Sequence, residues 1–464
     1  MAGFRKNEID LTEGKYLPKL IRFALPIMVT GVLQLMFNAV DSMVVGQFVG
    51  DGALAAVTST GALITLIVNL FLGISVGSNV LAAQYYGAKR EKDVTEVLHT
   101  SVVLSLILGI VVLLIGQFFS RTFLNWMGSP DDVIDDAALY LKIYFIGAPF
   151  SLLYNFSAAI LRAAGDTKHP LIFLTIGGVL NVFLNLFCVL VLHLGVEGVA
   201  IGTIVSQFVS AVLVTVYYFS GKAPVRLVLK DLKISWKKLK TILMIGIPAG
   251  VQSIMFSISN VIIQSAVNSF GKIILAGNGA ANQIDNITYT AMQSVAQTSI
   301  NFVGQNVGAK KYDRIRRGLW ILLGMVSAVG LVFGGGMYLL GPQLLGIFTS
   351  TPESIEAGML KLLFLGVPYF IGGIMDTLAG AVRGLGTSIA PMVVAILGTC
   401  VLRVVWIMTV FQQYHTLESL FVTYPISWAV SAVGHGVCFL ILFRRMRRKL
   451  ENLPRQKRLR AENP

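Results

Sequence analysis

Long apolar stretches alternate with short polar segments along almost the whole chain. Each stretch reaches the length of about 20 residues that an α-helix needs to cross the hydrocarbon core of a bilayer. The pattern therefore predicts an all-α integral membrane protein with twelve transmembrane helices. The predicted helices cover residues 20–49, 53–83, 98–119, 137–161, 171–192, 196–219, 242–267, 273–307, 319–340, 359–382, 389–411 and 420–443.

Several of these stretches are longer than a hydrocarbon core of about 30 Å requires, so we expect tilted or kinked helices. A proline inside a helix removes a backbone hydrogen bond and is a natural kink site. The candidate kink sites are Pro26, Pro149, Pro248 and Pro368.

The composition argues against a water-soluble enzyme. Of the 464 residues, 55% are hydrophobic and 13% are charged, whereas soluble domains carry about 25% charged residues. The chain contains no phosphate-binding Gly-x-x-x-x-Gly-Lys-[Ser/Thr] motif, no His-Glu-x-x-His and no Gly-x-Ser-x-Gly. We therefore expect no enzyme activity, no cofactor and no resident metal, so any transport must use an energy source other than ATP.

The net charge of +14 is distributed unevenly along the chain. Cations follow the even-numbered predicted helices, while acidic side chains dominate the odd-numbered loops. By the positive-inside rule, both termini are predicted to be cytoplasmic, in a multi-pass protein of the inner cell membrane. The basic tail is interpreted as a signal for topology and anionic lipid rather than as a nucleic-acid site. The cationic segments are 89–92, 162–168, 222–240, 310–317, Arg383 and 444–460.

The two halves of the chain repeat each other at an offset of about 220 residues. Because each half has six predicted helices, both enter the membrane from the same side, and the repeats are parallel. This predicts an N-terminal six-helix bundle at 1–220, a cytoplasmic linker at 221–241, a C-terminal bundle at 242–443 and a basic tail at 444–464, with a central cleft between the bundles. The matching residues are Pro26, Gln84, Gly87, Lys142, Arg162 and Pro170 with Pro248, Gln305, Gly308, Lys361, Arg383 and Pro391.

Several motifs, taken in order, resemble those of the multidrug and toxic compound extrusion (MATE) transporters. They are Pro26, Phe37-Asn38-Ala39-Val40-Asp41-Ser42, the Gln-x-x-Gly-Ala-Lys segments at 84–89 and 305–310, the Arg-x-x-Gly pairs at 162–165 and 383–386, Asn181-Val-Phe-Leu-Asn185 and the segment 195–203. The resemblance covers nearly the whole chain. It implies secondary active export of amphipathic, often cationic compounds, driven by inward flow of Na⁺ or H⁺, with alternating access of two bundles.

Asp41 is the first candidate for ion coupling, because it places a charge well inside an apolar stretch. A carboxylate at that depth can hold either a proton or a sodium ion. Asn181 and Asn185 share one face of the fifth predicted helix, and Thr203 on the sixth adds a further oxygen. In the family subgroup with the best-known sites, an aspartate occupies the position of Asn185, so one negative charge is missing here. Interhelical hydrogen bonding is the alternative interpretation of these amides.

The second half carries its own buried charges. Asp285 and Arg403 fall at similar predicted depths, about 12–18 Å from the outer face, and are expected to form a structural ion pair. Alternatively, Asp285 faces the cleft as a counter-charge for the substrate. Asp376 lies nearer the cytoplasmic side, where it meets either a cationic substrate or a local cation.

The remaining polar and soft side chains are expected to line a substrate cleft. The predicted cleft residues are Met36, Phe37, Asn155, Met255, Asn282, Asp285, Tyr289 and Asp376. The expected partners are small amphipathic molecules and the lipid bilayer, with no nucleic acid and with the monomer as the working unit. Two other functions stay open: a flippase for lipid-linked precursors, which would need a strongly cationic cleft, and a channel.

Overall fold

The computed structural model describes residues 8–128 and 133–452, and within those ranges the ordered elements are helices only. The chain divides into two compact units, each described separately here. Unit 1 comprises the chain up to Asp10, Val29–Tyr86 and Arg90–Gly250, and unit 2 comprises Leu11–Met28, Gly87–Lys89 and the chain from Val251. The division therefore falls inside α1 and α8 and does not coincide with the predicted linker at 221–241.

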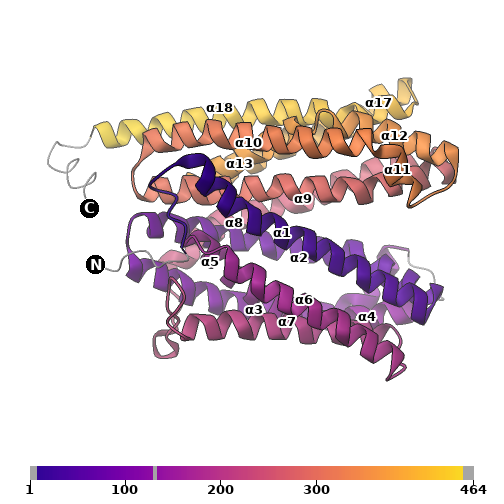
Figure 1. Cartoon of the computed structure of the whole chain (residues 1–464), viewed down its shortest axis with the longest axis horizontal. Helices are drawn as coiled ribbons and strands as arrows, with labels where there is room; N and C mark the ends of the chain where they lie inside the picture. The colour runs from indigo at the N-terminus through magenta and orange to yellow at the C-terminus, as the bar shows by residue number, and fades with distance from the viewer. Residues whose placement is uncertain (1–7, 129–132, 453–464) are drawn as a thin grey trace. The chain divides into compact units, whose positions relative to one another are not determined.

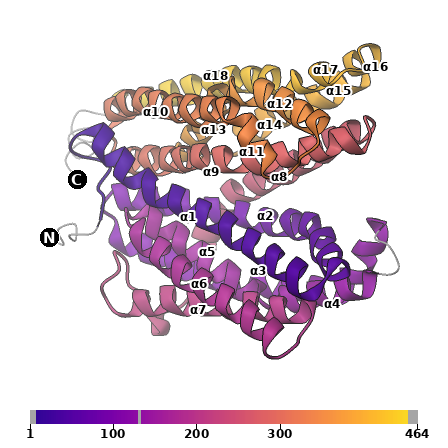
Figure 2. The same ribbon diagram turned by 45° about the vertical axis from the view of Figure 1, so that its right-hand side comes forward.

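Unit 1 contains the helices of the first half, with the second half of α1 and the first half of α8. Its core is built from apolar side chains of α3, α4, α5 and α7, among which Leu98, Leu141 and Phe156 are fully buried. Figure 2 shows α6 and α7 running side by side. The helices are α1 (Tyr16–Val44), α2 (Asp51–Gly87), α3 (Glu91–Trp126), α4 (Ile134–Ile146), α5 (Ala148–Ala163), α6 (Lys168–Leu190), α7 (Val196–Phe219) and α8 (Trp236–Asn268), with π-helical η1 (Val45–Val49) and 3₁₀-helical η2 (Leu229–Asp231).

Unit 2 is organised around α13, which packs against α9, α10 and α18 (Figure 1). Small residues allow these close approaches: Gly380 lies against the backbone of α9 and Gly330 against that of α13. The helices are α9 (Lys272–Gly308), α10 (Tyr312–Leu339), α11 (Gly341–Gly346), α12 (Pro352–Gly366), α13 (Tyr369–Gly384), α14 (Ile389–Ala395), α15 (Leu402–Met408), α16 (Val410–Gln413), α17 (Leu417–Phe421) and α18 (Thr423–Glu451), with π-helical η3 (Ile396–Val401).

The twelve predicted membrane helices are confirmed, with changes in their continuity. Within the described residues, nine helices are individually long and apolar enough to cross a membrane, and two more spans are bent pairs. The pairs α4–α5 and α12–α13 bend by 47° and 46°, beside Pro149 and Pro368, so two predicted kink sites are confirmed. Pro26 and Pro248 instead lie inside unbroken helices. The twelfth span is α9, whose amide side chains lower its hydropathy.

The predicted tail and one predicted helix also differ in detail. Residues 444–451 continue α18 instead of beginning a separate tail, and residues 453–464 lie outside the described part. The predicted helix at 389–411 is interrupted by the π-helical turn η3 and a short break at Thr409.

Candidate functional site

Four helices of unit 1 line an open cavity of about 150 Å³. Each helix contributes residues three, four or seven positions apart, which is the spacing of one helical face. The lining is Gln34, Phe37, Asn38 and Asp41 from α1; Ser151, Tyr154 and Asn155 from α5; Leu174, Gly177, Gly178 and Asn181 from α6; and Thr203, Ser206, Gln207 and Ser210 from α7. Asp41 is the one ionisable acid among these lining residues, so the cavity combines a single carboxylate with amide and hydroxyl groups.

The volume of this cavity is enough for a hydrated ion. One water molecule needs about 10–15 Å³ of such space, so a cavity of about 150 Å³ has room for several waters or for an ion with part of its hydration shell.

Asp41 is held by an amide from α6. The Nδ2 of Asn185 donates a hydrogen bond of 2.6 Å to Oδ1 of Asp41. Asn185 is fully buried, and its own Oδ1 has no hydrogen-bond partner among the described residues. That oxygen lies against Gly202 of α7, where an added Cβ would come within 2.1 Å of it. A glycine is therefore required for α7 to pack this closely on the amide that holds Asp41.

A second pair of polar side chains lies next to Asp41. The Nδ2 of Asn181 donates to Oγ1 of Thr203 over 3.4 Å, and the Thr203 hydroxyl donates to the Val199 carbonyl over 3.0 Å. Asn181 and Thr203 line the same cavity as Asp41. The structure thus brings together all four residues of the predicted coupling cluster, three in the cavity wall and Asn185 directly behind it.

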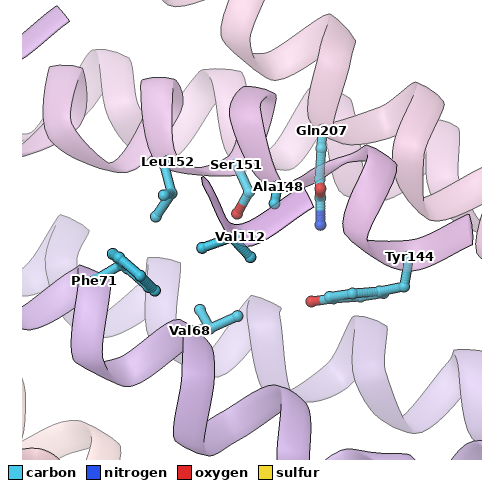
Figure 3. A pocket seen from close by; sticks show the side chains of 8 residues that line it. All are labelled: Val68, Phe71, Val112, Tyr144, Ala148, Ser151, Leu152 and Gln207. Carbon is cyan, nitrogen blue, oxygen red and sulfur yellow. The ribbon is translucent and has the colours of Figure 1, made fainter. Parts of the chain in front are cut away.

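A smaller hollow of about 10 Å³ shares Ser151 and Gln207 with this cavity. Figure 3 shows its apolar wall, formed by Val68, Phe71, Val112 and Leu152, and the amide of Gln207 pointing into it. A space of this size holds at most about one water molecule. The polar cavity therefore borders a tightly packed apolar region.

The predicted cleft residues of the first half have different environments. Phe37 and Asn155 line the ion-sized cavity, and the Phe37 ring packs directly on Gly178. Met36 is 57% exposed and is not among the cavity lining. Asn155 donates its amide to the Ser151 carbonyl over 2.8 Å.

In unit 2, two of the predicted residues belong to one hydrogen-bonded group. The Nε2 of Gln293 donates to Oδ2 of Asp376 over 3.0 Å and to the Tyr289 hydroxyl over 2.7 Å. Asp285 lies nearer the start of α9 and interacts with the Tyr369 hydroxyl. Asn282 accepts a hydrogen bond from Lys361, and Met255 is partly buried on α8.

The predicted ion pair between Asp285 and Arg403 is wrong. Arg403 is buried, and its Nε donates to the Ser427 hydroxyl over 3.0 Å. Its Nη1 donates to Oδ1 of Asn260 over 3.5 Å, and the guanidinium lies 4.3 Å from the centre of the Tyr424 ring. The charge of Arg403 is thus stabilised by a hydroxyl, an amide and an aromatic face rather than by a carboxylate.

Sequence reasoning missed one deeply buried cation. Lys361 is 3% exposed and lies within α12, although a lysine near the start of an apolar stretch is expected to reach the membrane surface. Its match with Lys142 in the repeat was the available signal. Sequence reasoning also missed the polar stripe of Ser206, Gln207 and Ser210 on α7, which their helical spacing after Thr203 indicates.

Comparisons with known proteins place this geometry in a family. The sequence model of the MatE family matches residues 26–187 and 248–409, once in each half of the chain. The probable multidrug resistance protein YoeA of Bacillus subtilis is 30% identical over 418 residues, covering 88% of this chain and 90% of that protein. The probable multidrug resistance protein YpnP of the same organism is 31% identical over 396 residues, covering 85% and 88%.

Solved structures show the same fold. The crystal structure of MATE in the bent conformation matches with a TM-score of 0.86 at 23% identity, over 96% of this chain and 98% of that chain. The outward-facing conformation of a multidrug resistance MATE family transporter matches with a TM-score of 0.88 at 22% identity, over 96% and 99%. The family model matches both halves, the relatives are similar over most of their length, and the twelve-helix fold is shared. The chain therefore belongs to the MatE family of multidrug and toxic compound extrusion transporters.

Proposed function

We propose that the protein is a secondary active antiporter that exports small amphipathic, often cationic compounds in exchange for inward H⁺ or Na⁺. The observation that carries the proposal is the carboxylate of Asp41 in an ion-sized cavity, held by the Asn185 amide. The names of the Bacillus relatives support multidrug export. The proposal assigns no reaction chemistry and no resident cofactor, and it takes the monomer as the working unit in the inner cell membrane with both termini cytoplasmic.

Asp41 is suited to exchange because its carboxylate can hold either a proton or a sodium ion. Carboxylate, amide and hydroxyl oxygens are the ligands that hard cations prefer, and Asp41, Asn181 and Thr203 supply all three kinds in one wall. A bound proton neutralises the carboxylate in place of a cation. Either ion neutralises the buried negative charge of Asp41. Release of the ion into the cytoplasm restores that charge, and the hydrogen bond from Asn185 then stabilises the free carboxylate.

The bound ion drives transport only through its unequal affinity for two conformations of the protein. Occupation of Asp41 from outside favours one conformation, and binding of the substrate from inside favours the other.

The test is efflux of a fluorescent cation from loaded proteoliposomes under an imposed Na⁺ gradient or an imposed pH gradient. Asp41→Asn keeps the size of the side chain and removes its charge, so gradient-driven efflux is expected to be lost. The matched control is Asp135→Asn, since Asp135 is exposed and pairs with Arg121 on the surface. Equal gradient-driven efflux in wild type and Asp41→Asn would reject Asp41 as the coupling residue, and efflux without any gradient dependence would favour a channel.

A further inference from the structure

Unit 2 contains a buried ammonium whose hydrogen bonds go to neutral oxygens. The Nζ of Lys361 donates to Oδ1 of Asn278 over 2.8 Å and to Oδ1 of Asn282. Both amides belong to α9, four residues apart and therefore on one face. The Asn278 Nδ2 donates in turn to Oε1 of Gln264 over 3.1 Å, which fixes its oxygen toward the lysine. The ammonium also lies 5.9 Å from the centre of the Phe421 ring. A buried ammonium with amide and aromatic partners alone is costly unless a nearby charge balances it.

Asp285 adds a carboxylate on the same face of α9, three residues beyond Asn282. The Tyr369 hydroxyl hydrogen-bonds to this carboxylate, while its Oδ1 is buried and has no hydrogen-bond partner among the described residues. The carboxylate acts on the Lys361 ammonium from beyond direct contact. The group as a whole is therefore one monovalent cation bonded to two amide oxygens, with a carboxylate farther along the same helix face.

A comparison of the two halves shows that Asn278, Asn282 and Asp285 occur only in the half whose lysine is buried. Helices α2 and α9 have the same length of 37 residues, and their final Gly87 and Gly308 match in the repeat. In this register, Val57, Gly61 and Ile64 of the first half stand where the second half has Asn278, Asn282 and Asp285. Lys142, the counterpart of Lys361, is exposed. A lysine is thus present in both halves, but the oxygen set occurs only where the lysine is buried.

We propose that Asn278 and Asn282, with the carboxylate of Asp285 as the counter-charge, form a binding site for a monovalent cation, and that the side chain of Lys361 permanently occupies it as a tethered cation. Amide oxygens bonded to a single positive charge, with a carboxylate on the same helix face, are an arrangement that a free Na⁺ or a small alkylammonium would also use. In the native protein this site then exchanges no ion, because its cation is covalently attached. Removal of the lysine side chain is expected to open the site to a free cation. The proposal is independent of the role proposed for Asp41.

The experiment measures thermal unfolding of the purified full-length protein in detergent. All variants carry Asp41→Asn, so that the candidate site in unit 1 does not contribute. Lys361→Ala is compared in NaCl, methylammonium chloride and choline chloride at equal ionic strength. We expect Lys361→Ala to unfold at a lower temperature, and Na⁺ or methylammonium, but not the larger choline, to raise that temperature saturably by about 2 °C or more. The Asp41→Asn parent is expected to show no such difference between the salts.

Three control variants separate a tethered cation from a lysine that only packs. Lys142→Ala removes the exposed counterpart and is expected to show no selective cation response. Adding Asp285→Asn to Lys361→Ala is expected to abolish the response and to give a more stable protein than Lys361→Ala alone, because no lone buried charge remains. Lys361→Arg keeps the charge and is expected to respond to no salt selectively.

Two results would overturn the proposal. One is a Lys361→Ala protein that unfolds identically in all three salts. The other is a double variant with Asp285→Asn that is no more stable than Lys361→Ala. If Lys361→Ala gives no folded protein, the yield of the double variant with Asp285→Asn is measured instead. Folded double variant supports the proposal, and its absence overturns it. Because every variant already lacks the Asp41 charge, these outcomes are separate from success or failure of the efflux test.

Discussion

Gly202→Ala gives a sharp test of the geometry that holds Asp41. The added Cβ would stand 2.1 Å from Oδ1 of Asn185, whereas ordinary contact begins near 3.4 Å, so the amide oxygen must move by about 1.3 Å. The backbone nitrogen of Asn185 lies 3.2 Å from the same Cβ, so the strain falls mainly on the side chain. The hydrogen bond of 2.6 Å to Asp41 depends on that side chain.

The expected magnitude follows from the value of this hydrogen bond. A hydrogen bond to a charged group contributes about 1.5–3 kcal/mol, and about 1.4 kcal/mol corresponds to a tenfold change in an equilibrium constant. We therefore expect Gly202→Ala to change the ion concentration for half-maximal efflux by about tenfold or more. The assay is gradient-driven efflux from proteoliposomes over a series of Na⁺ concentrations or pH values.

The matched control is Gly324→Ala in α10, because an added Cβ there would have no neighbour within 4 Å. It is expected to leave the ion dependence unchanged. A double-mutant cycle isolates the contact: in an Asn185→Ala background, Gly202→Ala should have little further effect. The reasoning is refuted if Gly202→Ala keeps the wild-type ion dependence, or if its effect is equally large without the Asn185 amide.

Two further predictions concern the charges of each unit. Asn185→Asp would add a second carboxylate beside Asp41, and at about 4 Å two like charges repel by about 4 kcal/mol in a medium with an effective dielectric constant of about 20. A shared Na⁺ relieves this repulsion, so the unfolding temperature of Asn185→Asp should rise more steeply with NaCl than that of the wild type; equal slopes would contradict a shared cation. The losses of stability in Asp285→Ala and Arg403→Ala should add in the double variant, because Arg403 makes its contacts elsewhere. A double variant more stable than either single variant would instead support an ion pair between Asp285 and Arg403.

Local pattern was enough to predict the helices and the shared face of Asn181 and Asn185, but not the contact of that face with Asp41. A spanning helix needs only a run of apolar residues. Pro149 and Pro368 mark the bends of the pairs α4–α5 and α12–α13, because proline cannot complete the helical hydrogen bonds. Asn181 and Asn185 share a face for the same reason of periodicity. The meeting of that face with Asp41 was suggested by the family resemblance, and the structure supplies the contact through Gly202.

Depth alone was not enough to predict partners across helices. Asp285 and Arg403 lie at similar predicted depths, but a helix has several faces, and depth does not say which face meets which neighbour. Arg403 points toward Ser427 and Tyr424 of α18, while Asp285 acts on Lys361 of α12. These choices depend on the rotation of each helix about its axis, which packing of side chains from distant segments determines.

The two halves solve the same electrostatic problem in different ways. A charge buried in the membrane interior requires a partner, and the partner is either attached to the chain or taken from solution. Asp41 faces a cavity with room for an ion and, among the described residues, accepts a hydrogen bond from the neutral amide of Asn185, so in the proposed mechanism its charge is left for a mobile cation. In the second half the ammonium of Lys361 already occupies the oxygens of Asn278 and Asn282, with Asp285 on the same helix face. Under the two proposals, one half therefore takes its cation from solution and the other carries it on the chain.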